Sequence, residues 1–151
     1  MAERARVLLV DDDPYDLLAL EAALAPLGCE LVCAHGGQEA LRLLLESDFS
    51  VAVLDLVMPR MNGLETAALI RGRDRSRGLP LILLTGFDED GLRAMPGWSA
   101  DLGVAYLGKP VEAEALRAAV AARVQGLSAS VAAKQAIRSA SALTPGSHES
   151  S

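Results

Sequence analysis

The sequence predicts an α/β protein in which five parallel strands form one doubly wound sheet with helices on both faces. Short apolar runs alternate five times with segments whose leucines recur at helical spacing, and such alternation is typical of a parallel sheet. Polar residues follow directly after these runs. That is the pattern expected where buried strands reach the surface at the ligand-binding edge of an open sheet.

Composition narrows the class of protein. The chain has 151 residues, of which 51% are hydrophobic and only 3% aromatic, so we expect one domain with an aliphatic core. A net charge of -6 argues against a nucleic-acid-binding surface. No apolar stretch approaches the ~18 residues of a membrane helix, and no secretory signal is recognisable, so we expect a cytoplasmic protein without a membrane partner. Cys29 and Cys33 are expected to be free, buried thiols.

The first half of the chain predicts three strands. Ala5 to Val10 is read as the first, and the helix after it begins at Asp13 and Pro14, because aspartate caps helices and proline is tolerated in the first turn. Gly28 ends that helix. The remaining elements are a strand at Glu30 to Ala34, a break at Gly36 and Gly37, a helix from about Gln38 to Ser47 that buries Leu41, Leu44 and Leu45, and a strand at Val51 to Leu54.

The second half continues the alternation. A loop with Pro59 and Gly63 precedes a helix that runs to about Arg71, and residues 71–78, RGRDRSRG, are expected to be a solvated surface loop. The helix that is expected from about Asp88 is interrupted by Pro96 and Gly97. The remaining elements are a fourth strand at Leu79 to Leu84, a helix from about Asp88, a fifth strand at Val104 to Leu107 and a last helix at about Glu112 to Gln125.

Composition also divides the chain into a domain at residues 1–126 and a Ser/Ala-rich tail at residues 127–151. The tail is expected to be weakly helical or disordered, because it has too few apolar residues to form a core. It contains no obvious output module, so the domain is expected to stand alone.

The residues that carry chemistry follow the strands. If the strand order is 2-1-3-4-5, the topological switch point falls between the first and third strands, and Asp11, Asp12 and Asp55 share one crevice. Thr85 follows the fourth strand and Lys109 follows the fifth. All five side chains therefore belong to the same edge of the predicted sheet.

Three carboxylates in one crevice predict a bound cation. Two unit charges ~4 Å apart repel by about 4 kcal/mol at an effective dielectric constant of 20, and oxygen ligands of this kind suit Mg²⁺. A metal, the ammonium of Lys109 and the hydroxyl of Thr85 around one carboxylate are what a phosphoryl group needs. Asp55 could then attack phosphorus and form an aspartyl phosphate.

Four segments, LLVDDDP, VLDLVMPRMNGLE, LILLTG and YLGKP, resemble the receiver domain of two-component response regulators over about residues 5–125. The resemblance implies a flavodoxin-like (βα)5 fold. It also implies that Asp55 is the phospho-acceptor and that Mg²⁺ is bound directly by Asp12, Asp55 and the backbone carbonyl of Val57. Asp11 would hold a metal-bound water.

The resemblance also implies how such a site would switch. Lys109 would contact the phosphoryl oxygens, Thr85 would reorient toward the phosphate, and Tyr106 would be the coupled aromatic switch. The Lys109–Pro110 bond is expected to be cis. A histidine kinase or histidine phosphotransfer protein would be the donor, and an unknown downstream protein would bind the face formed by the fourth helix, fifth strand and fifth helix. We expect a monomer or weak homodimer.

Two alternatives remain open. An aspartyl-phosphate hydrolase of the haloacid dehalogenase type usually has a second acid two residues after the nucleophile, where this chain has Val57. A phosphate-independent interaction module would keep the fold without the switch, although the complete set of polar site residues argues against it. Val57 and Phe87, both apolar, lie beside the predicted site.

Overall fold

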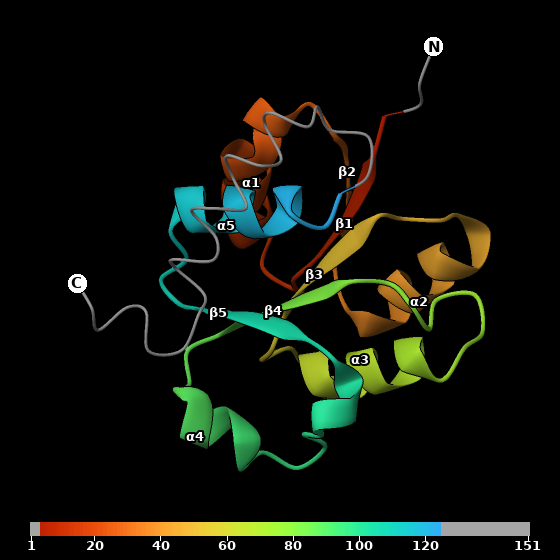
Figure 1. The fold of residues 1–151 in the computed structure, drawn as a ribbon, viewed down its shortest axis with the longest axis vertical. Coiled ribbons are helices and arrows are strands. Elements are labelled where there is room, and N and C mark those ends of the chain that lie inside the picture. Colours follow the sequence, from red (N-terminus) through yellow and green to blue (C-terminus); the bar gives the residue numbers. More distant parts are fainter. Residues whose placement is uncertain (1–3, 125–151) are drawn as a thin grey trace.

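The computed structural model describes residues 4–124. Its five strands form a single parallel sheet in the order β2-β1-β3-β4-β5 (Figure 1). This confirms the predicted fold class and strand order. The strands are β1 Arg6–Val10, β2 Glu30–Ala34, β3 Val51–Asp55, β4 Leu81–Thr85 and β5 Ala105–Gly108.

Helices cover both faces of the sheet, with α1 and α5 on one face and α2 and α3 on the other (Figure 1). The α-helices are α1 Pro14–Leu24, α2 Gly37–Glu46, α3 Gly63–Arg71, α4 Glu89–Arg93 and α5 Ala113–Ala121, and two 3-10 helices are η1 Ala25–Leu27 and η2 Ala100–Leu102. Pro96 and Gly97 follow the short α4, as the sequence predicted.

The core consists of two aliphatic clusters separated by the sheet. Successive strand residues point to opposite faces, so in β3 Val51 and Val53 join the cluster under α1 and α5, whereas Ala52 and Leu54 join the cluster under α2 and α3. Every residue of β3 and β4 is buried. Burial of these two strands therefore fixes the position of their carboxyl ends, where the residues of the site lie.

Side-chain caps fix where several helices begin. The Asp13 carboxylate accepts a hydrogen bond from the Tyr15 N–H at 2.9 Å, as predicted for an N-cap. At α3 the Asn62 side chain accepts from the Glu65 N–H and the Glu65 carboxylate accepts from the Asn62 N–H, both at 2.8 Å. This reciprocal capping box fixes the loop between β3 and α3.

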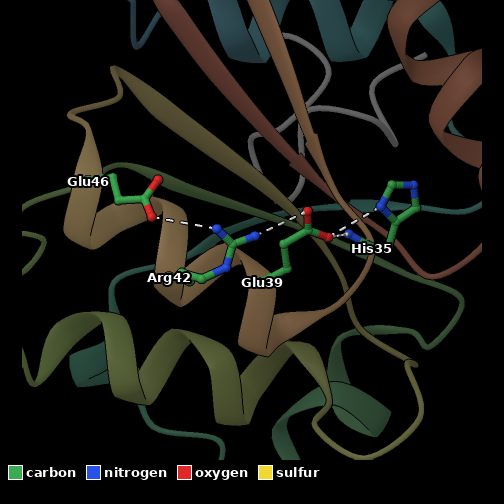
Figure 2. A network of polar contacts seen from close by, with 4 residues as sticks. All are labelled: His35, Glu39, Arg42 and Glu46. Carbon is green, nitrogen blue, oxygen red and sulfur yellow. Dashed lines mark hydrogen bonds and ion pairs between the residues drawn. The ribbon is translucent and has the colours of Figure 1, made fainter.

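A surface network lines the first turns of α2 (Figure 2). The Glu39 carboxylate accepts from the His35 N–H at 2.8 Å and lies 3.7 Å from Arg42, which also pairs with Glu46 at 3.5 Å. The His35 N–H lowers the pKa of Glu39, against the opposing effect of partial burial. The contacts are largely solvent-exposed, so the network orients the turn into α2 more than it stabilises the fold.

Two predictions about elements are wrong in detail. Strand β4 begins at Leu81 rather than Leu79, because the Leu79 N–H donates to the Ser76 carbonyl in a turn at 3.0 Å and Pro80 has no N–H to give. Leu45 is 60% exposed, since α2 packs through the face formed by Ala40, Leu41 and Leu44.

Most of the arginine-rich stretch is exposed, as predicted, but several of its arginines also bond to neighbouring segments. The Arg71 guanidinium donates to the carbonyls of Leu79 at 2.6 Å and Leu102 at 2.7 Å, and burial lowers its pKa. Arg75 donates to the Leu45 carbonyl at 2.7 Å. These arginines satisfy carbonyl groups of three neighbouring segments, so the stretch is part of the structure that joins α2, α3 and η2.

The last helix ends earlier than predicted. Helix α5 ends at Ala121, four residues before the predicted end at Gln125, which lies outside the described residues together with the tail at 127–151. Cys29 and Cys33 are free thiols, as predicted, but only Cys29 is buried, whereas Cys33 is partly exposed. Within residues 4–124, no helix is both long and apolar enough to span a membrane.

Candidate functional site

Three acids meet where β1 and β3 end. These strands are direct neighbours, with Val10 opposite Leu54, so Asp11, which follows β1, lies next to Asp55, the last residue of β3. Carboxylate oxygens of Asp11, Asp12 and Asp55 all lie within 4.8 Å of one another. The predicted convergence of the three side chains is therefore present in the structure.

Burial sets the protonation of two of these acids. Asp11 is 2% exposed and Asp55 4% exposed, whereas Asp12 faces solvent. Desolvation raises the pKa of Asp11 to about 6, although the Asp13 N–H, 2.9 Å from the Asp11 carboxylate, opposes the rise. Desolvation likewise raises the pKa of Asp55 despite the opposing effect of Lys109. The crevice thus holds carboxylates whose charge is poorly compensated by the protein alone.

Lys109 supplies the positive charge that faces Asp55. It follows β5, its N–H donates to the Thr85 carbonyl at 2.8 Å, and the Lys109–Pro110 bond is cis. The Lys109 ammonium makes a short ion pair with the Asp55 carboxylate. Burial lowers the pKa of Lys109, but the hydrogen bond and charge of Asp55 outweigh it and hold this pKa above its usual value.

Thr85 ends β4 and is 1% exposed. Its hydroxyl accepts a hydrogen bond from the Phe87 N–H at 2.9 Å, so the side chain is engaged with its own turn in this structure. Val57 and Phe87 are 65% and 47% exposed. Both side chains are therefore open to solvent.

Tyr106 lies on β5 and is partly buried. Burial raises its pKa, and the carboxylate of Glu89 on α4, which is hydrogen-bonded to the phenol, raises it further. Glu89 lies in the first turn of α4, so this contact links β5 to α4. Helix α4 follows the turn that contains Thr85. The five polar predicted residues Asp11, Asp12, Asp55, Thr85 and Lys109 occupy one edge of the sheet, and Tyr106 lies two residues before Gly108, which ends β5 at that edge.

Sequence reasoning missed three contributors. Asp16, in the first turn of α1, acts electrostatically on Asp11, Asp55 and Lys109; its spacing of one helical turn from Asp12 was the available signal. Glu89 could not be paired with Tyr106 without knowing how α4 packs. Gly63 was read only as a turn residue.

Gly63 permits a close approach that holds the acceptor strand. A Cβ atom at this position would lie 2.6 Å from the Asp55 carbonyl oxygen and 3.0 Å from the Leu56 Cα. The Gly63 N–H donates to the Leu56 carbonyl at 2.8 Å. Only a residue without a side chain lets α3 begin this close to the end of β3.

The arrangement fits a hard divalent cation beside a nucleophile. The donors are the carboxylate oxygens of Asp11, Asp12 and Asp55, and Mg²⁺ prefers such oxygen ligands. The desolvated acids also give the site a negative charge that a cation would neutralise. Chemically, the site can hold a cation, an anionic group and a carboxylate nucleophile within reach of one ammonium.

Known proteins carry the same pattern. A sequence model of the family described as "Response regulator receiver domain" matches residues 7–121. The protein PilH of Pseudomonas aeruginosa is 29% identical over 81% of this chain and 99% of its own length. A probable chemotaxis protein CheY of Rhizobium etli is 31% identical over 81% of this chain and 94% of its own length.

Solved structures agree. The chemotaxis protein CheY4 of Vibrio cholerae superimposes with a TM-score of 0.66 at 27% identity, covering 74% of this chain and 92% of that chain. The receiver domain of a Pseudomonas aeruginosa sensor histidine kinase gives a TM-score of 0.71 at 26% identity, covering 80% and 98%. The latter structure was determined with a magnesium ion coordinated in its active-site cleft.

Proposed function

Because the chain belongs to the family of response regulator receiver domains, we propose that it is a phospho-accepting signalling switch with Asp55 as the acceptor. The observation that carries this proposal is the position of Asp55: it ends a central strand, lies within 4.8 Å of two further acids, and is paired with Lys109. Receiver domains are switches rather than conventional enzymes, and the only chemistry proposed here is the domain's own phosphorylation and its reversal.

The proposed reaction is a phosphoryl transfer from a histidine kinase or histidine phosphotransfer protein. An Asp55 carboxylate oxygen attacks phosphorus, the bond between phosphorus and the donor nitrogen breaks, and Asp55 becomes an aspartyl phosphate. Asp12, Asp55 and the Val57 carbonyl would hold Mg²⁺ directly and Asp11 would hold it through water. When bound, Mg²⁺ would neutralise charge on the phosphoryl oxygens.

Switching would follow from the new charge beside Asp55. Lys109, now paired with the Asp55 carboxylate, would move to a phosphoryl oxygen. The Thr85 hydroxyl would leave the Phe87 N–H and donate to the phosphate. Tyr106 would then change its packing, since its phenol is linked through Glu89 to α4, the helix that follows the Thr85 turn.

The proposed output is a changed affinity for a protein that binds α4, β5 and α5. Phosphorylation would favour one of two arrangements of this face, which is a population shift. We assign the switch to residues 1–126, acting in the cytoplasm as a monomer or weak homodimer, with no nucleic-acid partner.

Two other functions make different predictions. A hydrolase of the haloacid dehalogenase type usually has a second acid two residues after the nucleophile, but position 57 is an exposed valine. An interaction module would not need the acid cluster, and a buried Asp11 with a pKa near 6 is a costly feature to keep without a use. Both facts favour the receiver.

Incubation with acetyl phosphate and Mg²⁺, followed by intact mass spectrometry, tests the proposal. We expect a mass increase of one phosphoryl group that depends on Mg²⁺. Turnover of generic phosphate esters without a stable adduct would support the hydrolase. No adduct from acetyl phosphate or from a histidine kinase would support the interaction module and contradict our proposal.

A further inference from the structure

A cavity of ≈ 440 Å³ lies at the amino edge of the sheet, and we call it the amino-edge cavity. Its walls are the connection from α2 into β3, the connection from α3 into β4, and Arg123 after α5. Asp55 is at the opposite end of β3, which has five residues, so the two edges are about 16 Å apart at the rise of a strand. The cavity is therefore separate from the proposed phosphorylation site, and its size suits a small organic ligand.

Arg123 brings a positive charge to the amino-edge cavity without a carboxylate to balance it. Its guanidinium donates to the Ala119 carbonyl at 2.7 Å, and within residues 4–124 it makes no ion pair with an acid. Burial lowers the pKa of Arg123, and no acid of the described residues opposes this effect. Partial burial of an unpaired charge is unfavourable, so an anion beside Arg123 would be stabilised.

Arg75 adds a second guanidinium to the lining of the cavity. Its Nε donates to the Asp48 carboxylate at 2.8 Å and its Nη1 donates to the Leu45 carbonyl at 2.7 Å. A guanidinium carries several N–H donors, so both arginines keep donors for a ligand. Asp48 is the one acid in the lining, and Arg75 lowers its pKa through their hydrogen bond. The lining therefore holds two positive charges and one negative charge.

The rest of the lining combines hydroxyl groups with apolar walls. Ser47 and Ser50 line the cavity, and neither hydroxyl is hydrogen-bonded to another residue of the described part of the chain. Leu44, Phe49 and Leu79 contribute apolar side chains. A bare inorganic ion would leave these apolar walls without a partner, whereas an organic anion would use the charges and the walls together.

We propose that the amino-edge cavity binds a small organic anion that carries a carboxylate or phosphoryl group on an apolar body. The anionic group accepts hydrogen bonds from Arg123, because the planar guanidinium fork matches carboxylate and phosphate oxygens, and Arg75 adds a second positive charge. Outside residues 4–124 the sequence has only two acids, Glu3 and Glu149, which favours an anion from solution. The proposal does not depend on phosphorylation of Asp55.

Titration of the isotope-labelled full chain with phenyl phosphate and with benzoate, followed by amide NMR spectra in the presence of EDTA, tests the proposal. We expect saturable shifts at residues 47–50 and 75–79, with a dissociation constant on the order of 1 mM for a ligand of this size. The anion that binds more tightly identifies the preferred charged group. Benzyl alcohol, which has no charge, and inorganic phosphate, which has no apolar body, should each bind about tenfold more weakly.

Variants of the lining separate this cavity from general attraction of anions. Arg123→Gln and Arg75→Gln should each weaken binding about tenfold, because each removes a charged hydrogen-bond donor. Arg77→Gln is the matched control: it removes the same charge from the same stretch, but Arg77 does not line the cavity. Asp48→Asn should strengthen binding, because it removes the carboxylate that competes for Arg75. The spectra show whether each variant is folded, and Arg75→Gln keeps the test valid if Arg123→Gln is not.

Four results would overturn the proposal. They are the absence of saturable shifts at residues 47–50 and 75–79, binding that both glutamine variants of the lining leave unchanged, an equal loss of binding in Arg77→Gln, and inorganic phosphate that binds as tightly as phenyl phosphate. Binding that is lost in Lys109→Gln but kept in Arg123→Gln would also overturn it, because the anion would then occupy the proposed phosphorylation site.

Discussion

Asp11 and Asp55 are carboxyl groups held inside the protein at the point where a cation is expected, and their burial makes the site sensitive to pH. Desolvation raises the pKa of Asp11 from 3.8 to about 6. Below that value the folded protein holds a proton on Asp11, which removes the negative charge that would hold a metal-bound water. The site is therefore expected to lose its metal in mild acid, well above the range in which an ordinary aspartate titrates.

We predict that the affinity for Mg²⁺ falls roughly tenfold between pH 7.5 and pH 5, because binding must displace the proton from Asp11. The sign follows from the raised pKa: Asp11 is mostly ionised at the higher pH and mostly protonated at the lower. Calorimetric titration with Mg²⁺ at both values measures the change. The Asp11→Asn variant should bind more weakly with a smaller pH dependence, and equal affinities of the parent chain at both pH values would show that Asp11 is not linked to the metal.

The side chains of Val57 and Phe87 are expected to control the lifetime of the phosphorylated state. Hydrolysis of an aspartyl phosphate needs a water held in line with the bond to the carboxylate, and neither side chain can hydrogen-bond such a water. Both side chains are substantially exposed, so replacing them should change the stability of the fold by no more than about 0.5 kcal/mol. Because neither side chain can hold the attacking water, we expect slow dephosphorylation in the native chain.

The double variant Val57→Asn with Phe87→Glu should lose phosphate roughly fivefold faster or more, since positioning of the water controls much of the rate. Binding of Mg²⁺ should be retained, because Val57 would contribute only its backbone carbonyl. Release of labelled phosphate at saturating Mg²⁺ measures both chains. A native chain that releases its label as fast as the double variant would exclude control by these side chains.

At the scale of the elements, the start of α3 packs against the end of β3 at Gly63. The Cβ atom of an alanine there would lie 2.6 Å from the Asp55 carbonyl oxygen, and this backbone atom cannot move without moving the acceptor. Gly78 offers a matched control, because nothing lies within 4 Å of its Cβ position. The two glycines therefore separate the effect of a close approach from the general effect of replacing glycine.

Gly63→Ala is predicted to destabilise the domain by about 1–3 kcal/mol and to slow phosphorylation of Asp55. Gly78→Ala should do neither. Thermal unfolding followed by circular dichroism and the initial rate of adduct formation check the two effects. A Gly63→Ala chain with native stability and native rate would mean that the loop relaxes freely and does not position Asp55.

Most elements could be predicted because their signals are local. Asp13 with Pro14 and Asn62 with Glu65 are short-range caps, and the apolar strands are bounded by turn residues. The errors arose where tertiary contacts decide: Leu45 is exposed because of how α2 packs, and Arg71 is partly buried because it satisfies carbonyls of Leu79 and Leu102. No spacing in the sequence encodes such contacts.

The site was predictable to a similar degree. Asp11, Asp12 and Asp55 could be grouped because parallel strands end at one edge, and because the strand order 2-1-3-4-5, which was assumed for the prediction, is the order in the structure. The pairing of Tyr106 with Glu89 and the influence of Asp16 depend on how helices sit against the sheet. They became visible only with the structure.

At the scale of the whole molecule, residues 4–124 contain a complete sheet and both core clusters. Truncation after Gly126 should therefore leave a folded domain that binds Mg²⁺ and accepts phosphate. The melting temperature should fall by no more than about 5 °C, because both core clusters consist of residues that the truncated chain retains. Loss of folding, or of a dimer, in sedimentation and thermal unfolding experiments would contradict this division of the chain.

The central claim is that the phosphoryl group is carried by Asp55, and the most direct measurement locates it. The native chain, Asp55→Asn and Asp13→Asn are each incubated with acetyl phosphate and Mg²⁺ and analysed by intact mass. Asp13 is the matched control, because it caps α1 in the same stretch of acids and asparagine also caps helices. We predict one phosphoryl adduct on the native chain and on Asp13→Asn, and none on Asp55→Asn. An undiminished adduct on Asp55→Asn would contradict the account.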